Sequence, residues 1–250
     1  MQRLANKIAL VTGASKGIGA AIARHLGAAG AHVIVNYATS KPGADQTVAA
    51  IVAAGGTAAA IQGDFSRPGD IARVFGEIKA SHGKLDILVN NAGVYGFGPI
   101  EQVTPEEFHR QFNLNVLGLL LATQAAVQLM GPEGGSVINV SSVVGSQPPA
   151  FSSIYSATKG AVDNLTLSLS KEFGPRKIRV NSVNPGLVAT EGTRSTGFLE
   201  GEFHDNAVKQ TPLGRIGQPD DIGPVAVFLA SPESYWVNGQ SIHASGGMTL

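Results

Sequence analysis

The sequence predicts an α/β fold: one doubly wound parallel sheet of seven strands with helices on both faces. Short runs rich in β-branched residues alternate along the chain with longer segments of helical periodicity. The segments 8–12 and 85–90 are apolar on both sides, as buried parallel strands are. No linker, repeat or low-complexity tract divides the 250 residues, so a single domain spanning 1–250 is expected.

The first half of the chain reads as three strand–helix units. Strands are expected where apolar and β-branched residues cluster, at 8–12, 32–37 and 57–62. Helices are expected where apolar residues recur every three or four positions, at 18–29, 44–54 and 70–81. Gly30 follows the first of these helices and Gly55-Gly56 follow the second, as expected for helix ends.

The second half continues the alternation with a longer helix. Further strands are expected at 85–90, 137–140, 178–183 and 241–244, and further helices at 105–130, 153–173 and 220–230. Thr104 and Pro105, followed by two glutamates, form a helix start signal with an N-cap, a first-turn proline and first-turn acids. The Gly- and Thr-rich segment 186–210 has no regular period and is left without an element.

Charge and composition exclude several classes of partner. Lys plus Arg and Asp plus Glu number 18 each, so there is no basic field for nucleic acid or an anionic membrane. Hydrophobic residues are 43% and charged residues 14%, which suggests surface buried between subunits. The chain has no cysteine, which excludes thiolate catalysis and Cys-ligated metal, and no metal site is expected.

The expected location is the cytoplasm. The most apolar late stretch, 116–130, is interrupted by Thr123, Gln124 and Gln128. It is shorter than the roughly 18–20 residues that a membrane span needs. The apolar run at 8–11 is too short for a signal peptide, so neither a leader nor a membrane span is expected.

A glycine-rich turn follows the first expected strand. Gly13, Gly17 and Gly19 have the spacing G-x-x-x-G-x-G, and the first helix begins among them. Glycines let backbone N–H groups approach a pyrophosphate, and a helix N-terminus attracts its negative charge. A plain tight turn is the alternative for the spacing alone, but the position in a β-α-β unit favours dinucleotide binding.

The end of the second expected strand selects the nucleotide. NAD-binding folds usually carry an acid there for the ribose 2′-hydroxyl. Here the chain has Asn36 and Tyr37, with no acid before Asp45. Ser40 and Lys41 follow, and Lys16 lies in the glycine turn, so the pattern favours NADP(H), with NADPH binding more tightly than NADH. Lys41 could equally be a solvated loop lysine.

Tyr155 and Lys159 are the candidate catalytic pair. They are four residues apart in an expected helix and therefore share a face. A free tyrosine has a pKa of about 10, and a nearby ammonium together with an oxidised nicotinamide is expected to lower the pKa of Tyr155. The alternative is a core tyrosine beside a surface lysine, and the pair alone does not decide between them.

Other polar residues accompany the pair. Ser141 and Ser142 close the preceding strand at the carboxyl end of the sheet, where a hydroxyl can bind a substrate oxygen or cap the strand end. Asn115 falls on the apolar stripe of the long helix, which is formed by Phe108, Phe112, Leu119 and Ala122. A buried amide needs partners, so Asn115 is either a structural hydrogen-bonding residue or part of a proton relay.

Taken together in order, these residues resemble the short-chain dehydrogenase/reductase family, with its Rossmann-like fold, over nearly the whole chain. The resemblance rests on the glycine turn, on Asn90-Asn91-Ala92-Gly93, on Asn115, Ser142, Tyr155 and Lys159, and on Asn184-Pro185-Gly186 with Thr190. It is nearest to the 3-oxoacyl-(acyl carrier protein) reductase-like and carbonyl reductase branch. It implies a homotetramer formed through the long helices and the last strand.

The resemblance also implies a role for each of these residues. Ser142 would orient the substrate carbonyl, Tyr155 would transfer the proton, Lys159 would hold the nicotinamide ribose, and Asn115 would hold a water that connects Lys159 to solvent. Asp64, beside Phe65, would bind the adenine, and Thr190 with the backbone near Val188 would grip the carboxamide. The full cofactor set is expected to be Gly13, Ser15, Lys16, Gly17, Ile18, Gly19, Asn36, Tyr37, Ser40, Lys41, Asp64, Phe65, Asn91, Ala92, Gly93, Tyr155, Lys159, Pro185, Gly186, Val188 and Thr190.

The expected activity is NADP(H)-dependent reduction of a ketone or 3-oxoacyl carbonyl to a secondary alcohol. In the resembled family the segment at about 190–212 is a substrate lid; here it carries Phe198, Leu199 and Phe203. Tyr95, Phe97, Phe151 and Ile154 lie near the site in sequence, so the pocket is expected to suit a small-molecule ketone with a hydrophobic arm. The alternatives are an alcohol, sugar or steroid dehydrogenase acting oxidatively, or an NADP-binding regulator without turnover.

Overall fold

A computed structural model describes residues 3–195 and 197–248. Within these residues seven strands form one sheet in the order β3-β2-β1-β4-β5-β6-β7, and every pairing is parallel. The strands are β1 Ile8–Val11, β2 His32–Tyr37, β3 Thr57–Gln62, β4 Ile87–Asn90, β5 Gly135–Val140, β6 Ile178–Pro185 and β7 Ser241–Ala244. The expected doubly wound sheet is confirmed.

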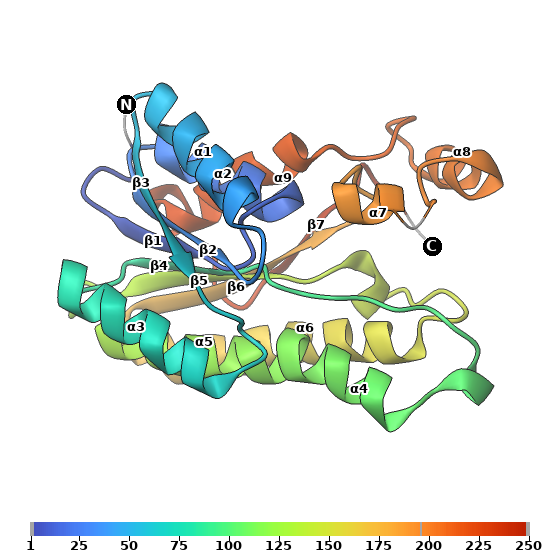
Figure 1. Cartoon of the computed structure of the whole chain (residues 1–250), viewed down its shortest axis with the longest axis horizontal. Helices are drawn as coiled ribbons and strands as arrows, with labels where there is room; N and C mark the ends of the chain where they lie inside the picture. Colours follow the sequence, from blue (N-terminus) through green and yellow to red (C-terminus); the bar gives the residue numbers. More distant parts are fainter. Residues whose placement is uncertain (1–2, 196, 249–250) are drawn as a thin grey trace.

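Helices cover both faces of the sheet (Figure 1). One face carries α1 Gly17–Ala28, α2 Lys41–Ala53 and α9 Pro219–Ala230. The opposite face carries α3 Pro68–His82, α4 Pro105–Phe112, α5 Leu119–Leu129 and α6 Ser153–Phe173. Short 3-10 turns connect the elements: η1 Ile100–Gln102, η3 Val143–Gly145, η4 Gly174–Arg176 and η5 Pro232–Ser234.

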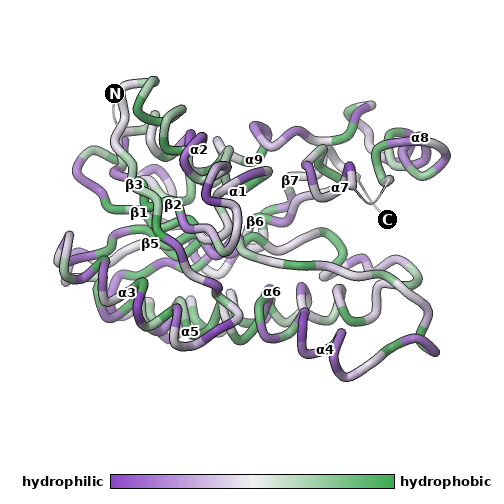
Figure 2. Tube along the Cα trace, viewed as in Figure 1, coloured by the Kyte–Doolittle hydropathy of each residue, from purple (hydrophilic) through white to green (hydrophobic). Residues whose placement is uncertain are grey.

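Two apolar layers hold the helices to the sheet. Leu26 of α1 and Ile222 of α9 pack with Val33 and Val89 on one face. Phe75 of α3 and Val127 of α5 pack with other strand residues on the opposite face. Figure 2 shows the hydrophobic β1 between these layers and the hydrophilic α4 at the periphery. The central strands are therefore buried on both sides, whereas the edge strands β3 and β7 are more exposed.

The long helix expected at 105–130 contains an irregular turn. Residues Asn113–Gly118 form a π-helical segment, η2, between α4 and α5. A Cβ on Gly118 would collide with the carbonyl oxygen of Phe65, so the helix approaches the β3–α3 loop closely here. Such π turns often occur at functional sites, and this one contains Asn115.

Part of the expected apolar stripe does not face the core. Phe108 is 41% exposed and stacks on Phe112 with ring centroids 4.2 Å apart, whereas Leu119 and Ala122 are buried. The stripe drifts out of register because the π segment adds an extra residue to the helical turn. The whole run 105–129 is, by length and composition alone, long and apolar enough to cross a membrane. In this fold α5 packs against α3 and the sheet.

The segment 186–210, left without an element by the sequence, contains two helices. They are α7 Glu191–Ser195 and α8 Gly201–Gln210. Both lie beyond the carboxyl ends of β6 and β7 (Figure 1). Residue 196 of the expected lid lies outside the described residues. A five-residue helix is too short to show a helical period in sequence, which explains why α7 was missed.

We expect Gly19→Ala to destabilise the fold at the glycine turn. A Cβ on Gly19 would collide with Nδ2 of Asn91 and lie 2.6 Å from the carbonyl oxygen of Gly13. Overpacking of this kind costs about 1–3 kcal/mol. The matched control is Gly76→Ala in α3, where a Cβ meets no atom within 4 Å and a gain of up to about 1 kcal/mol is expected. Urea unfolding measures both, and equal midpoints for the two variants would contradict the packing argument.

Candidate active site

The glycine turn after β1 is shaped to receive an anion. Gly13 and Gly17 have φ angles of 61° and 58°, which side-chain-bearing residues rarely adopt. In the described structure, Lys16 at the N-cap of α1 makes no side-chain capping bond, and the first turn has no acid. The first backbone N–H groups of a helix have no acceptor within the helix. The turn therefore offers donors and a positive dipole end to a phosphate.

Buried amides fix this turn to its neighbours. Asn36 accepts a hydrogen bond from the N–H of Gly13 at 3.1 Å and donates to the carbonyl of Gly63 at 3.0 Å. Asn91 donates through Nδ2 to the carbonyl oxygens of Thr12 and Gly13 at 2.8 and 3.0 Å. The hydroxyl oxygen of Thr12 accepts from the N–H groups of Asn91 and Ala92. The amides of Asn36 and Asn91 thus hold the backbone that would face a dinucleotide.

The residues expected near the adenosine end lie along the same edge of the sheet. Lys41 begins α2, and its exposed ammonium pairs with Asp45 at 2.7 Å. Asp64 accepts from the N–H and hydroxyl of Ser66 at 2.9 and 2.7 Å. Phe65 is buried. The structure places these residues at the carboxyl ends of β2 and β3, but the polar groups of Lys41 and Asp64 already have partners within the protein.

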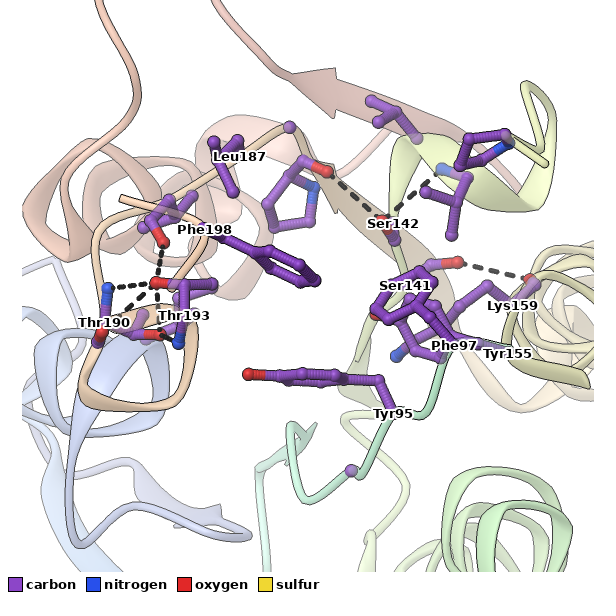
Figure 3. A pocket seen from close by; sticks show the side chains of 18 of the residues that line it. Tyr95, Phe97, Ser141, Ser142, Tyr155, Lys159, Leu187, Thr190, Thr193 and Phe198 are labelled. Carbon is purple, nitrogen blue, oxygen red and sulfur yellow. Dashed lines mark hydrogen bonds between the residues drawn. The ribbon is translucent and has the colours of Figure 1, made fainter. Parts of the chain in front are cut away.

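A cavity of about 440 Å³ opens at the carboxyl ends of β4, β5 and β6 (Figure 3). It brings Tyr155, Lys159 and Ser142 together with Val188 and Thr190, which were expected at the carboxamide. Other members of the expected cofactor set that line it are Ile18, Asn91, Gly93, Pro185 and Gly186. The remaining residues of the expected cofactor set lie outside this cavity.

Lys159 is buried beneath Tyr155. Its ammonium donates to the carbonyl oxygen of Val140 at 2.8 Å and lies 5.8 Å from the centroid of the Tyr155 ring. Both residues come from the first turns of α6, as their spacing predicts. Ser141 donates to the carbonyl of Lys159 at 3.2 Å, which ties the end of β5 to α6.

Ser142 sits at the start of the 3-10 turn that follows β5. Its hydroxyl oxygen accepts from the N–H of Val144 at 3.4 Å and lies 3.5 Å from the carbonyl oxygen of Pro185. Both contacts are long, so the hydroxyl can turn toward a substrate oxygen in the cavity. Asn115 does not line this cavity.

Asn115 is a buried amide whose side chain makes three hydrogen bonds within the protein. Its Oδ1 accepts from the N–H of Val94 at 2.9 Å, and its Nδ2 donates to the carbonyl of Val94 at 2.8 Å and to the hydroxyl of Thr158 at 3.1 Å. The side chain therefore couples η2 to the β4–α4 loop and to α6. Both polar atoms of its side chain are thus already engaged within the protein, as in the structural alternative expected for a buried amide.

Burial sets the protonation of the catalytic pair. It raises the pKa of Tyr155 to about 12, against a smaller lowering by a hydrogen bond with Ser142. Burial likewise lowers the pKa of Lys159 to about 8, with Asp163 acting in the opposite direction. In the protein without cofactor, removing the phenolate from water outweighs the hydrogen bond with Ser142, and the lowering expected beside an oxidised nicotinamide stays a prediction.

Aromatic rings form the rest of the cavity. Tyr95 and Phe97 both pack edge-on against Tyr155, with centroids 5.9 and 5.8 Å away. Phe198 packs on Phe97 at 5.5 Å and stacks with Phe203 at 4.7 Å. Figure 3 shows Tyr95 and Phe198 between Tyr155 on one side and Thr190 and Thr193 on the other. Ile154 and Leu199, also expected here, do not line the cavity.

Several residues of the site were missed by sequence reasoning. Thr193 lines the cavity and donates to the carbonyl of Val188 at 2.8 Å, and Thr190 donates its N–H to the Thr193 hydroxyl at 2.9 Å. Leu187 and Met248 also line it. Thr193 could have been indicated by its spacing from Thr190, because residues three apart share one face of a helix. Met248 is brought in only by the fold.

The chain matches known proteins over almost its full length. Residues 13–249 match a family model described as enoyl-(acyl carrier protein) reductase. An uncharacterized oxidoreductase of Methylorubrum extorquens is 54% identical over 248 residues, covering 99% of this chain and 100% of that protein. Versicolorin reductase 1 of Aspergillus parasiticus is 40% identical, covering 98% of this chain and 97% of that one.

A solved structure agrees with these sequence matches. The crystal structure of an angucycline C-6 ketoreductase with bound NADP superimposes with a TM-score of 0.92 at 39% sequence identity. The match covers 98% of this chain and 96% of the other.

We expect Lys159→Met to stabilise the folded protein at neutral pH. The pKa of Lys159 is lowered from 10.5 to about 8, so the unfolded chain binds its proton more strongly than the folded protein. The unfolding free energy of the wild type therefore falls as the pH decreases from 10.5 to about 8, and it stays low at pH values below this range. Removing the charge should raise the free energy of unfolding by about 1–3 kcal/mol, which allows for the loss of the hydrogen bond to Val140.

Urea unfolding between neutral and alkaline pH measures this effect. The amount by which the unfolding free energy of Lys159→Met exceeds that of the wild type, its advantage, should shrink as pH rises from about 8 to 10.5. Lys171→Met, at the exposed end of α6, is the control and should show no such trend. An advantage that does not change with pH would contradict the assigned burial cost.

Proposed function

The chain belongs to the short-chain dehydrogenase/reductase family, and from this premise we propose that it is an NADP(H)-dependent reductase that converts a ketone into a secondary alcohol. One observation carries the proposal: Tyr155, Lys159 and Ser142 meet in one cavity with the residues expected at the nicotinamide end. The ketoreductase and versicolorin reductase names of its relatives support the same reaction.

The residues along the sheet edge fit an NADP(H) molecule. The uncapped start of α1 and the left-handed glycines at 13 and 17 form a cradle that side chains would fill. Gly13, Ser15, Lys16, Gly17 and Gly19 are the residues that would hold the pyrophosphate. Lys41 would leave Asp45 to meet a 2′-phosphate, with Ser40 beside it.

The nicotinamide end would be held at the floor of the cavity. Lys159 would bind the ribose hydroxyls, and Thr190 with the backbone near Val188 would hold the carboxamide. Bound there, NADPH supplies a hydride to the carbonyl carbon of the substrate. Ser142 would orient the carbonyl oxygen of the substrate toward Tyr155.

The electrostatics of the cavity favour reduction. With a pKa of about 12, Tyr155 carries its proton at neutral pH and can donate it to the carbonyl oxygen as hydride arrives. The phenolate left behind is stabilised by the Lys159 ammonium, which is still protonated at neutral pH with its pKa of about 8. The oxidative direction needs a phenolate at the start, which burial disfavours.

The substrate is proposed to be a ketone on a flat, apolar ring system. Phe97 and Phe198 meet edge to face, and Phe203 stacks on Phe198, which leaves aromatic walls around the catalytic tyrosine. Offset and edge-to-face contacts with such walls favour planar aromatic groups. A sugar would instead need several hydrogen-bonding side chains, and the wall opposite Tyr155 offers chiefly Thr190 and Thr193.

The segment 190–212 is proposed to act as a substrate lid within a single domain spanning residues 1–250. From this segment, Phe198 packs on Phe97, Phe203 stacks on Phe198, and both line the cavity. Gly197 and Gly201 have positive φ angles of 75° and 66°, so they flank Phe198 with turns that glycine adopts readily. Rotation at these turns would open the cavity to the substrate.

The protein is further proposed to be a cytoplasmic homotetramer, with no nucleic-acid or membrane partner. Apolar side chains on the outward faces of the long helices support the subunit contacts: Phe108, Leu117 and Leu167 are each more than two-fifths exposed. Tyr235 and Trp236, ahead of the edge strand β7, are also exposed. Balanced charge supports the absence of nucleic acid and anionic membrane.

Tyr155→Phe is expected to lower kcat for ketone reduction by at least about a thousandfold, because the proposed proton donor beside Lys159 is lost. NADPH affinity, measured by cofactor fluorescence, should change little. The control is Tyr235→Phe, which removes the same hydroxyl from an exposed tyrosine and should retain wild-type activity. Retention of most activity by Tyr155→Phe would overturn the assignment.

A further inference from the structure

Asp163 lies one helical turn beyond Lys159 on α6. It is half-buried and does not line the catalytic cavity. Both of its carboxylate oxygens accept from Nδ2 of Asn184, at 3.1 and 3.0 Å. Asn184 lies in β6, is fully buried and directly precedes Pro185. The contact therefore joins the helix that carries the catalytic pair to the strand end that carries Pro185 and Gly186.

Asn184 extends this contact to the strand that carries Ser142. Its Nδ2 lies 3.4 Å from the carbonyl oxygen of Ser142. The hydroxyl of Ser182 lies 2.7 Å from Oδ1 of Asn184 and 3.3 Å from Oδ1 of Asp163, and can donate to either. The carboxylate is therefore an acceptor on which two donors from β6, Asn184 and Ser182, converge.

The turn after Ser142 packs directly on this part of α6. A Cβ on Gly145 would lie 2.8 Å from Oδ2 of Asp163 and 3.0 Å from the carbonyl carbon of Lys159. Only a glycine permits the turn η3 to sit this close to α6. The positions of Ser142, Lys159 and Asp163 are thus fixed relative to one another by one small contact region.

Asp163 is also the carboxylate that bears on the buried ammonium. Burial lowers the pKa of Lys159, and Asp163 is the group that raises it. The other titratable groups facing Lys159 are Tyr155 on α6 and, next to that ring, Tyr95 from the β4–α4 loop. His243 of β7 is the register partner of Asn184 and brings an imidazole to that side of the network.

We propose that Asp163 is a positioning residue for the reaction: its carboxylate clamps Asn184, and through it the strand ends that bear Ser142 and Pro185, while placing a fixed negative charge one helical turn from Lys159. The inference rests on the proposed function, since it assigns Asp163 a part in presenting Ser142 and a charged Lys159 to the cofactor and ketone. Asp163 itself would contact neither the cofactor nor the ketone, since it does not line the cavity.

Asp163→Asn tests the charge while retaining the shape of the side chain. Ketone reduction needs a charged Lys159, so kcat/KM at saturating NADPH falls as pH rises through the pKa of Lys159. Removing a counter-charge lowers that pKa. The alkaline limb of the kcat/KM–pH profile, where activity falls with rising pH, is therefore expected to move to lower pH by about one unit, a tenfold change in the protonation equilibrium. The pH dependence of NADPH affinity should shift in the same direction and needs no turnover.

Two further variants separate charge from clamping. Asp163→Glu keeps the charge, so its alkaline limb should return to the wild-type position. Asn184→Ala keeps Asp163 but removes the clamp, and is expected to lower kcat roughly tenfold through misplacement of Ser142 without moving the limb. Glu172→Gln, at the exposed end of the same helix, is the matched control and should resemble wild type in every measurement.

The proposal is overturned if Asp163→Asn has the same alkaline limb and the same NADPH-binding profile as Glu172→Gln. If Asp163→Asn does not fold, Asn184→Ala decides: a lowered kcat with an unmoved limb supports the clamp, and wild-type kcat overturns it. A wild-type protein that binds NADPH but reduces no ketone would instead refute the proposed function. The NADPH-binding profiles would still test Asp163 in that case.

Discussion

The buried ammonium of Lys159 is the constraint around which the active site is organised. A charge removed from water is costly unless it is paired or hydrogen-bonded. Here the carbonyl oxygen of Val140 accepts a hydrogen bond from the ammonium at 2.8 Å. Asp163 lies one helical turn away and is itself hydrogen-bonded to Asn184. Because these partners come from β5, β6 and α6, keeping Lys159 charged requires the sheet edge and the helix to hold one arrangement.

The same arrangement sets the chemistry of Tyr155. The apolar walls that bury the lysine also bury the phenol, so their pKa values move apart: the pKa of Tyr155 rises to about 12 and that of Lys159 falls to about 8. At neutral pH the pair consists of a protonated phenol and a protonated amine, which suits donation of a proton to a carbonyl oxygen. Aromatic residues from the β4–α4 loop and the lid close the cavity over this pair, which couples substrate shape to the environment of the proton donor.

The sequence indicated the sheet and its edge because strand ends and glycine turns are local signals. Tyr155, Lys159 and Ser142 could be placed together because each follows a strand or begins a helix at a known point of the fold. Other features could not be predicted from the sequence because they depend on contacts between distant segments. The π turn at Asn115 depends on the close approach of Gly118 to Phe65, and the Asp163–Asn184 contact depends on the packing of α6 on β6. The direction of the Tyr155 pKa shift also depended on burial, which spacing does not report.

The proposed reaction is the transfer of a hydride from NADPH to a ketone in this cavity. The most direct measurement supplies NADPH deuterated at C4 of the nicotinamide, together with a panel of planar aromatic ketones, and examines the alcohol product by mass spectrometry and NMR. We expect one deuterium, bound to the new carbinol carbon, with a single configuration at that carbon. Absence of label in the alcohol, or no alcohol from any ketone while NADPH binds tightly, would contradict it.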